Sequence, residues 1–236
     1  MMSHIRADNI VIDFPIYGSR SRSLKNTVIR AATGGALATD ASERVVIRAI
    51  DHASFEWKEG DRIGLVGHNG SGKTTLLRAI VGVYEPVAGA IDVRGSVGSM
   101  LSIQLGMEPE ATGVENIYIR GAIMGLRRKE IDAFIDDVCE FSELGEYINM
   151  PVRSYSSGMA MRLAFAISTS ANADIIVMDE WLSVGDESFA KKAQERLKQL
   201  VGQAKILVMA SHSPDVIRTN CNKVVRLDHG RIVGNA

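Results

Sequence analysis

Cysteine is nearly absent from this chain of 236 residues, and its formal net charge is close to zero, at −1. Cys139 and Cys221 stand far apart and have no histidine or cysteine at metal-ligand spacing. This indicates a reducing compartment and argues against a structural zinc site held by the cysteines. The balanced charge gives no general reason to expect nucleic-acid binding, and we expect no nucleic-acid partner.

Long apolar runs are missing as well. No stretch approaches the roughly 20 consecutive apolar residues that a membrane-spanning helix needs. The polar start of the chain, Met1–Arg6, does not resemble a signal peptide. Hydrophobic residues make up 46% and charged residues 23%, which is ordinary for a globular chain able to bury a substantial core. We therefore expect a soluble, cytoplasmic protein.

What the chain does contain is an alternation of strand-like and helix-like segments. Apolar and β-branched runs predict strands at Ile5–Phe14, Val45–Ile50, Ala53–Trp57, Arg62–Val66, Ile175–Met178, Ile206–Ala210 and in a final hairpin of Val224–Leu227 and Arg231–Val233. The second and third of these are expected to be two antiparallel strands. Helical spacing predicts helices around Leu76–Val81 with a stop at Gly82, over Lys129–Leu144, over about Gly158–Ser170, and between the last two buried strands with Phe189, Ala193, Leu197 and Leu200 inward.

This alternation implies an α/β core, and the middle third of the chain supplies an inserted helical lobe. Between Pro15 and Ser42 the sequence turns rich in Ser, Gly and Arg. That stretch is either a solvated loop or contains a short helix with Leu24, Val28 and Ala31 on one face.

A glycine-rich octamer carries the first chemical signal. Residues 67–74 read Gly-His-Asn-Gly-Ser-Gly-Lys-Thr and match the phosphate-binding pattern G-x-x-x-x-G-K-[ST] in full. The glycines let the backbone curl so that its N–H groups point at phosphates, and the helix that follows adds its positive dipole end. Lys73 is expected to reach the β- and γ-phosphates, and the Thr74 hydroxyl to bind Mg²⁺. The expected nucleotide contacts are Gly67, His68, Asn69, Gly70, Ser71, Gly72, Lys73, Thr74 and Thr75.

Two acids, Asp179 and Glu180, end the buried strand that follows Ala173. Acids often end strands at a protein surface, so the pair means little by itself. With a phosphate-binding loop upstream, Asp179 is placed to hold the Mg²⁺ shell, and Glu180 to orient or deprotonate an attacking water.

A third motif narrows the family. Ser154–Met159 reads Ser-Tyr-Ser-Ser-Gly-Met and resembles the L-S-G-G-Q signature of ABC ATPases, with Ser156 and Gly158 at the diagnostic positions. The departures are Tyr155 for Leu, Ser157 for Gly and Met159 for Gln. The resemblance covers essentially the whole chain. It implies a single ABC-type P-loop NTPase domain over 1–236, with a RecA-like core, an antiparallel β lobe and a helical lobe at about 105–170.

The same resemblance assigns further roles. In the family each ATP lies between two protomers, which implies a homodimer in which Ser156, Ser157 and Gly158 of one protomer complete the other's site. His212 matches the switch histidine that contacts the γ-phosphate, so Glu180, His212 and Lys73 are the expected catalytic residues. Ser183–Asp186 occupies the place of the loop that crosses the dimer interface.

Two assignments implied by the family remain open. The aromatic residue that stacks on adenine is Phe14, with Tyr17 as the alternative. The glutamine that senses Mg²⁺ and couples to a membrane subunit is Gln104, although it stands about one residue out of register before Pro109.

Within the family, the chain resembles the ATPase subunits that export polysaccharides and polyol phosphates. The segments that carry this are Glu108–Ile117, Arg120–Leu126, Tyr155–Met159 with Arg162–Phe165, and Asp179–Asp186. The resemblance implies a peripheral ATPase on the cytoplasmic face of the membrane, using ATP and Mg²⁺, bound to a pair of separate transmembrane permease subunits. The cargo would be a lipid-linked polysaccharide. Because the chain stops after its last hairpin, we expect no C-terminal carbohydrate-binding domain and export without recognition of a terminal cap.

Three other functions are weighed against this one. An exporter ATPase for drugs, lipids or ions disagrees with the segments just named. A soluble ABC ATPase of translation or DNA repair usually has tandem cassettes or a long coiled-coil insertion, and neither is present. A regulatory module with little turnover disagrees with the intact Lys73, Asp179, Glu180 and His212.

Overall fold

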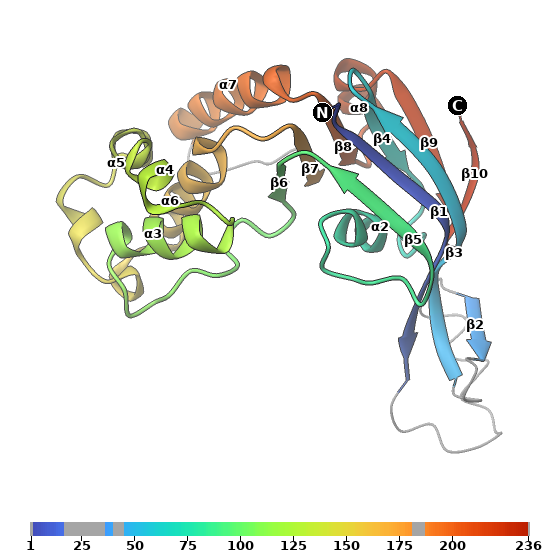
Figure 1. Ribbon diagram of the computed structural model, residues 1–236. Helices are drawn as coiled ribbons and strands as arrows, with labels where there is room; N and C mark the ends of the chain where they lie inside the picture. Colours follow the sequence, from blue (N-terminus) through green and yellow to red (C-terminus); the bar gives the residue numbers. More distant parts are fainter. Residues whose placement is uncertain (1, 17–35, 40–44, 181–186, 236) are drawn as a thin grey trace. The chain divides into compact units, whose positions relative to one another are not determined.

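The computed structural model describes residues 2–16, 36–39, 45–180 and 187–235 of the chain (Figure 1). The chain forms two compact units. Unit 1 comprises residues 1–97, 174–181 and 205–236, and unit 2 comprises residues 98–173 and 182–204. The sequence leaves the stretch 15–42 open between a solvated loop and a short helix, and its residues 24–31 lie outside the described residues, as do the alternative adenine contact Tyr17 and the loop Ser183–Asp186.

Unit 1 contains an antiparallel sheet with the strand order β2-β3-β1-β5. Its strands are β1 (His4–Pro15), β2 (Ala36–Thr39), β3 (Val45–Lys58) and β5 (Ala88–Arg94). The prediction of two strands at 45–50 and 53–57 is wrong, because both belong to β3 and pair with β1. His52 has a φ of 55°, and the β1–β3 register shifts beside it, so the chain bulges at 51–52 without turning back.

The second sheet is largely parallel and has the order β10-β9-β4-β8-β7-β6. Its strands are β4 (Arg62–Val66), β6 (Val97–Met100), β7 (Ile175–Asp179), β8 (Ile206–Ala210), β9 (Lys223–Asp228) and β10 (Arg231–Asn235). Strand β8 runs parallel to β4 on one side and to β7 on the other, and all five of its residues are buried. The predicted buried parallel strands and the final hairpin are confirmed.

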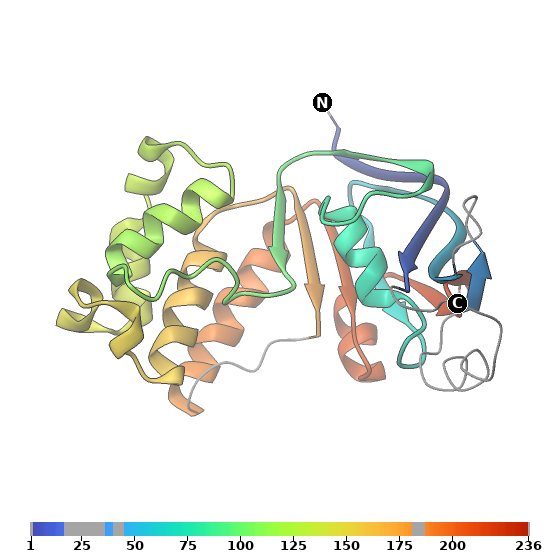
Figure 2. The ribbon, with the colours of Figure 1, turned by 90° about the horizontal axis from the view of Figure 1, so that it is seen from below.

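Two helices of unit 1 pack on these strands. Helix α2 (Lys73–Ile80) contacts β7 and β8 of one sheet and β3 and β5 of the other, so it lies between the sheets (Figure 2). Its apolar side chains Leu76 and Leu77 are fully buried there. Helix α8 (Pro214–Asn220) packs on β4, where Ile217 comes so close to Gly64 that an added Cβ would lie 2.8 Å from its Cγ2.

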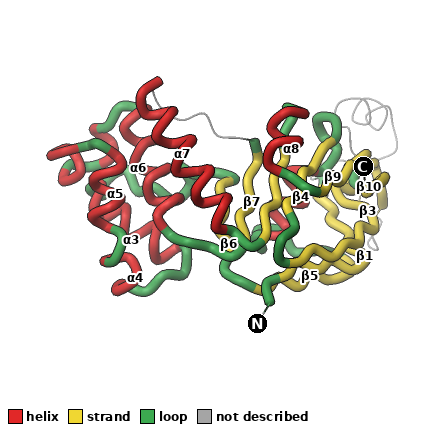
Figure 3. The backbone as a smooth tube through the Cα atoms, turned by 90° about the horizontal axis from the view of Figure 1, so that it is seen from above, coloured by secondary structure: helices red, strands yellow, loops and turns green. Residues whose placement is uncertain are grey.

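Apart from residues 98–100 at the end of β6, the regular structure of unit 2 among its described residues is helical, as the red segments of Figure 3 show. Its helices are α3 (Gly113–Ile123), α4 (Arg128–Asp132), α5 (Ile135–Ser142), α6 (Ser157–Ser170) and α7 (Glu187–Gln203), with 3₁₀ turns η1 (Gly145–Asn149) and η2 (Val152–Ser154). Helix α6 forms the centre of this unit's core, and Leu163 to Ile167 are nearly inaccessible. The four inward residues predicted on α7 are buried, as expected.

The single helix predicted over 129–144 is wrong. The chain forms α4 and α5 there, and Phe134 between them has φ −120° and ψ 1°, outside the helical region. Ile131 packs against Gly121 of α3, where an added Cβ would lie 2.6 Å from the isoleucine side chain. Val138, in α5, is fully buried. None of the described helices is long and apolar enough to cross a membrane.

Candidate functional site

The glycine-rich loop connects the buried strand β4 to helix α2, as its sequence predicts. A Cβ on Gly67 would lie 2.3 Å from the carbonyl oxygen of Leu227, and one on Gly72 would lie 2.6 Å from that of Ala49. Gly72 also has a φ of 105°, a conformation that L side chains rarely adopt. The loop therefore keeps its curled path only with glycine at both positions.

Lysine and threonine at the start of α2 contact the loop and β7. The Lys73 ammonium donates to the carbonyl oxygens of Gly67 and His68, at 2.9 Å and 3.1 Å, so its charged end lies over the loop. The Thr74 hydroxyl donates to Asp179 Oδ2 at 2.6 Å, although the two residues are 105 apart in sequence. The structure thus brings the first two predicted motifs together.

Glu180 is held firmly by the end of strand β8. Its backbone N–H donates to Ala210 O at 2.9 Å. The Ser211 hydroxyl donates to Glu180 Oε2 and the His212 backbone N–H to Oε1, both at 3.0 Å. Glu180 also has a φ of 72°, which is uncommon for glutamate and costs about 1–3 kcal/mol where it occurs.

The predicted switch histidine lies beside this glutamate. His212 Nε2 is 3.9 Å from Glu180 Oε1, and more than half of the His212 side chain is exposed. Gly67, Ser211 and His212 line one cleft of about 740 Å³. Ser211 is a contact that no motif in the sequence indicated, because a serine between a buried strand and a histidine carries no distinctive pattern.

The residues of this site fit a nucleoside triphosphate and a divalent cation. Glycines without room for a Cβ line the loop, and helix α2 has no side-chain cap on its first turn. Ser71 is fully buried, and its hydroxyl has no partner among the described residues. A hydroxyl and a carboxylate, from Thr74 and Asp179, offer the oxygen ligands that Mg²⁺ prefers.

The third predicted motif begins helix α6 of unit 2. Ser156 is the N-cap residue, and its hydroxyl accepts a hydrogen bond from the Met159 N–H at 3.2 Å. Ser157 is exposed in the first turn. A Cβ on Gly158 would meet only Ser156 Oγ, at 3.9 Å, so the packing of unit 2 does not require glycine there.

Comparison with known proteins shows the family to which this chain belongs. Residues 50–183, more than half of the chain, match the family model described as ABC transporter. The chain is 40% identical to the O-antigen export system ATP-binding protein RfbE of Yersinia enterocolitica, over 98% of this chain and 97% of that protein. The chain belongs to the ABC transporter family.

Two other similar proteins are longer than this chain. The O-antigen export system ATP-binding protein RfbB of Myxococcus xanthus is 37% identical over 95% of the chain, which covers 52% of that protein. The teichoic acids export ATP-binding protein TagH of Bacillus anthracis is 40% identical over 78% of the chain, which covers 33% of that protein.

The fold is that of solved ABC cassettes. A dimeric ATP-binding cassette in a post-hydrolysis state with ADP and Pi superposes with a TM-score of 0.69 over 98% of this chain and 97% of the other. Sequence identity is 18%, so this likeness concerns the fold alone. The predicted ABC-type P-loop NTPase fold is confirmed.

Tyr155, a departure from the family signature, ties the start of α6 to the rest of unit 2. Its hydroxyl donates to Tyr147 O at 2.7 Å. A Cβ on Gly113 would lie 2.5 Å from the Tyr155 hydroxyl oxygen. Burial raises the pKa of the Tyr155 hydroxyl above its usual value. Gly113 and Tyr155 belong to two different segments of the export-group resemblance, so those segments meet here.

The loop that contains Gln104 is held by a buried arginine. The Arg120 guanidinium donates to Ile103 O at 2.6 Å, to Leu105 O, and to Ser168 Oγ at 3.0 Å. Desolvation lowers the pKa of Arg120, and no carboxylate among the described residues pairs with it. Gln104 itself is exposed between its two anchored neighbours. Its role in Mg²⁺ sensing stays a prediction.

Phe14 lies near the end of β1 and is half-buried. Its ring packs edge-on against Tyr84, with 5.1 Å between the ring centroids. Arg78 of α2 donates to the Tyr84 hydroxyl at 3.0 Å and holds that ring in place. Stacking of Phe14 on adenine stays a prediction.

Proposed function

We propose that this chain is the ATP-binding and ATP-hydrolysing subunit of an exporter for lipid-linked polysaccharide of the O-antigen or capsule type. The proposal rests on two supports. The first is 40% identity, over nearly the full length of both chains, to a protein named for O-antigen export, together with partial matches to proteins named for O-antigen and teichoic acid export. The second is the arrangement of Thr74, Asp179 and Glu180 at one edge of the parallel sheet.

Binding of ATP depends on the loop and on α2. Backbone N–H groups of the loop and the uncapped first turn of α2 provide donors for the phosphates. Lys73 exchanges its two carbonyl partners for phosphate oxygens, which are stronger acceptors because they are charged. Thr74 and Asp179 would hold Mg²⁺, which neutralises the charge that develops on the phosphoryl oxygens.

Hydrolysis depends on Glu180. Donors in Ser211 and in the His212 backbone fix the orientation of its carboxylate, and each oxygen keeps a further lone pair that can orient a water and accept its proton. The exposed imidazole of His212 lies next to that carboxylate, where it would contact the γ-phosphate. The fixed position of the Glu180 carboxylate beside His212 is the observation that best supports this mechanism.

The complete site requires a second protomer. The first turn of α6 offers Ser156, Ser157 and Gly158 to a ligand outside its own unit, and the free space at Gly158 supports this role. We infer that two chains form a homodimer with ATP at the interface. The dimer would bind a pair of separate permease subunits at the cytoplasmic face of the membrane, with Gln104 near the coupling surface.

The test of the catalytic assignment is Glu180→Gln. The amide keeps the shape of the side chain but cannot accept a proton, so ATP hydrolysis should fall at least about a hundredfold. ATP binding should persist, and the variant should accumulate as a closed dimer visible by light scattering. Glu85→Gln, at an exposed glutamate of the same unit, is the control and should hydrolyse ATP at the parent rate. Parent-rate hydrolysis by Glu180→Gln would exclude this glutamate as the base.

The cargo is tested separately, by purifying the tagged chain from mild-detergent extracts and identifying what accompanies it by mass spectrometry. We expect a membrane permease together with a lipid-linked sugar polymer. Recovery of ribosomes or DNA-repair factors would exclude export and leave the ATPase assignment standing.

A further inference from the structure

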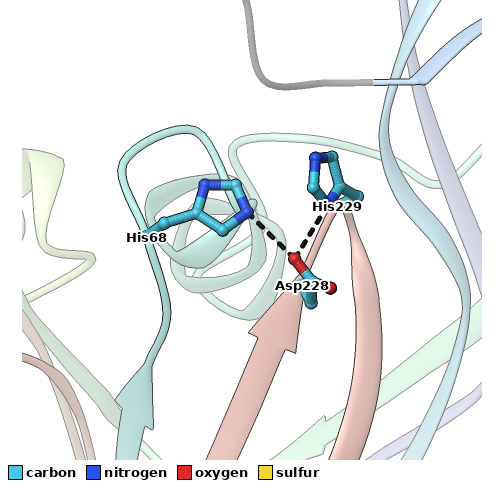
Figure 4. Close-up of side chains that lie close together, drawn as sticks. All are labelled: His68, Asp228 and His229. Atoms are coloured by element: carbon cyan, nitrogen blue, oxygen red, sulfur yellow. Dashed lines mark hydrogen bonds and ion pairs between the residues drawn. The ribbon is translucent and has the colours of Figure 1, made fainter.

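Three metal-ligating side chains meet at the rim of the glycine-rich loop in unit 1 (Figure 4). His68 belongs to the loop, Asp228 ends β9, and His229 begins the turn that leads to β10. His68 Nε2 lies 3.0 Å from Asp228 Oδ1, and His229 Nδ1 lies 2.7 Å from the same oxygen. One ligand atom from each residue lies within 4.8 Å of the other two.

The surroundings of His68 call for a cation at its Nε2 atom. Its Nδ1 atom lies 2.7 Å from the carbonyl oxygen of Asn69, which can only accept a hydrogen bond, so Nδ1 carries a hydrogen. In the neutral ring Nε2 then has a bare lone pair, which faces the carboxylate oxygen of Asp228. Two lone pairs repel each other at 3.0 Å unless a second proton or a metal ion lies between them.

The donor set favours a transition metal over the Mg²⁺ expected at Thr74. Two imidazoles and one carboxylate suit Zn²⁺, Co²⁺ and Ni²⁺, whereas Mg²⁺ prefers oxygen ligands throughout. The bond from His68 Nδ1 to a backbone carbonyl is the outer contact that metal-bound histidines usually make. Tetrahedral zinc, with bonds of about 2.0–2.1 Å, separates its ligand atoms by about 3.3 Å, so the three side chains need to move only slightly.

The scaffold under these ligands is rigid, and the ligands themselves are accessible. His229 and Gly230 have φ values of 46° and 80°, the pattern of a tight hairpin turn. The Gly230 N–H donates to Ser71 O of the loop, and Gly230 O accepts from the Asp51 N–H, both at 2.9 Å. The side chains of His68, Asp228 and His229 are 42%, 51% and 59% exposed, so an ion can reach them from solvent.

We propose that His68, Asp228 and His229 form a binding site for a transition-metal ion of the Zn²⁺ class, with a water completing the coordination. The ion clips the phosphate-binding loop to the β9–β10 turn. The site is separate from the Mg²⁺ position at Thr74 and Asp179. Metal binding at this site requires neither nucleotide nor permease. Its test is therefore independent of the proposed export function.

The chain contains its own matched control. His52 follows Asp51 as His229 follows Asp228, its Nδ1 also lies 2.7 Å from the preceding aspartate's Oδ1, and its φ is also positive, at 55°. No second histidine of the described residues joins this pair. Asp51 instead accepts from the Arg231 guanidinium at 2.6 Å. A metal that needs only an Asp-His pair would bind both places, whereas the proposed ion binds only the first.

The experiment is a calorimetric titration of the nucleotide-free full chain with Zn²⁺ in excess Mg²⁺, repeated with Co²⁺ to record the visible spectrum of a tetrahedral site. We expect one tight equivalent for the parent and for His52→Asn. His229→Asn and Asp228→Asn should each bind at least about tenfold more weakly and lose the Co²⁺ spectrum. Asparagine suits the positive φ at both histidine positions, so each histidine variant keeps its turn.

His68→Gln tests whether the loop takes part. It should also lose the tight equivalent, with far-UV circular dichroism confirming that it is folded. Zn²⁺ should raise the Tm of the parent and of His52→Asn and leave that of His229→Asn unchanged. Parent-like zinc affinity in His229→Asn, or an equal loss in His52→Asn, would overturn the proposal.

Discussion

Helices α2 and α6 both begin at motifs expected to face phosphate, yet their first turns are built differently. Helix α2 starts from Gly72 in a left-handed conformation and has no side-chain cap. Helix α6 starts from Ser156 in an extended conformation, and the serine hydroxyl caps it. The first N–H groups of α2 therefore have no side-chain acceptor and are left for a ligand. In α6 one of these N–H groups, that of Met159, already donates to the Ser156 hydroxyl.

The glycines of the two motifs differ in the same way. Backbone carbonyls of the same unit exclude a side chain from Gly67 and Gly72. Nothing in unit 2 excludes one from Gly158. The loop before α2 is therefore shaped by its own chain, whereas the packing of unit 2 gives no reason for glycine at 158, and its role in a partner's ATP site stays a prediction. Substitutions that add one methyl group separate these two cases.

The largest effect is expected for Gly72→Ala. The methyl group would meet the Ala49 carbonyl at 2.6 Å, and the φ of 105° alone costs about 1–3 kcal/mol for a residue with a Cβ. We expect a clear loss in the free energy of unfolding by urea and loss of binding of a fluorescent ATP analogue. Gly82→Ala isolates the backbone cost, because Gly82 has a φ of 79° and open space around it, and this variant should still bind ATP. Equal behaviour of the two variants would contradict the steric account.

Gly158→Ala should reverse the pattern. A helical glycine with free space gains up to about 1 kcal/mol of stability when it becomes alanine, so urea unfolding should be unchanged or shifted upward. ATP turnover should fall at least about tenfold, because the methyl group displaces the partner's phosphate from close contact. Gly202→Ala in α7 is the control, since this glycine also has nothing within 4 Å, and it should keep full turnover. Unimpaired turnover in Gly158→Ala would remove α6 from the ATP site.

Smaller effects are expected at the helix caps. Ser156→Ala removes the cap of α6, and Thr112→Ala removes the capping box of α3, in which Thr112 and Glu115 bond to each other's backbone. Each should lower the free energy of unfolding by about 1 kcal/mol. Only Ser156→Ala should also lower ATP turnover measured at saturating ATP. A matching loss of turnover in Thr112→Ala would show that the helical unit as a whole, and not the α6 start, controls the rate.

The smallest effect is a pH dependence of α3. The backbone N–H of Thr112, and then its hydroxyl, hold the pKa of Glu115 below its ordinary value of 4.5. A lowered folded-state pKa means that the contribution is fully present above pH 4.5 and is lost as the pH falls through the folded value. The difference in urea stability between parent and Glu115→Gln should therefore narrow on acidification. A constant difference would contradict the capping role of the charge.

The phosphate-binding loop and its acidic partner could be predicted from sequence because the chemistry is local. Buried β4 and β7 read as short, mostly apolar runs, and the functional residues stand at the end of each strand or directly after it. The hydrogen bond between Thr74 and Asp179 follows from two such motifs at the carboxyl ends of two parallel strands of one sheet, with only β8 between them. Glu180 was likewise placed by its position after a buried strand.

Other features depend on contacts that sequence spacing does not reveal. Residues 129–144 contain no glycine or proline, yet the helix breaks at Phe134, three residues after Ile131, which packs on Gly121 of a different helix. The continuity of β3 depends on a single positive φ at His52, which pairing with β1 accommodates. The roles of Ser211 and Arg120 arise only when distant backbone carbonyls and carboxylates come together. Phe14, Gln104 and the α6 motif stay predictions, because a nucleotide or a second chain is what would define them.

The bonds of Glu180 also determine how the proposed catalytic base responds to heat. Its amide and both carboxylate oxygens are bonded to residues 210–212, directly after the fully buried strand β8. Backbone groups in such a strand usually open only when the whole unit unfolds. The free energy needed to displace Glu180 is therefore expected to be that of unfolding the core and not that of opening a surface loop. A heated sample should lose ordered Glu180 in the same step in which it loses the fold.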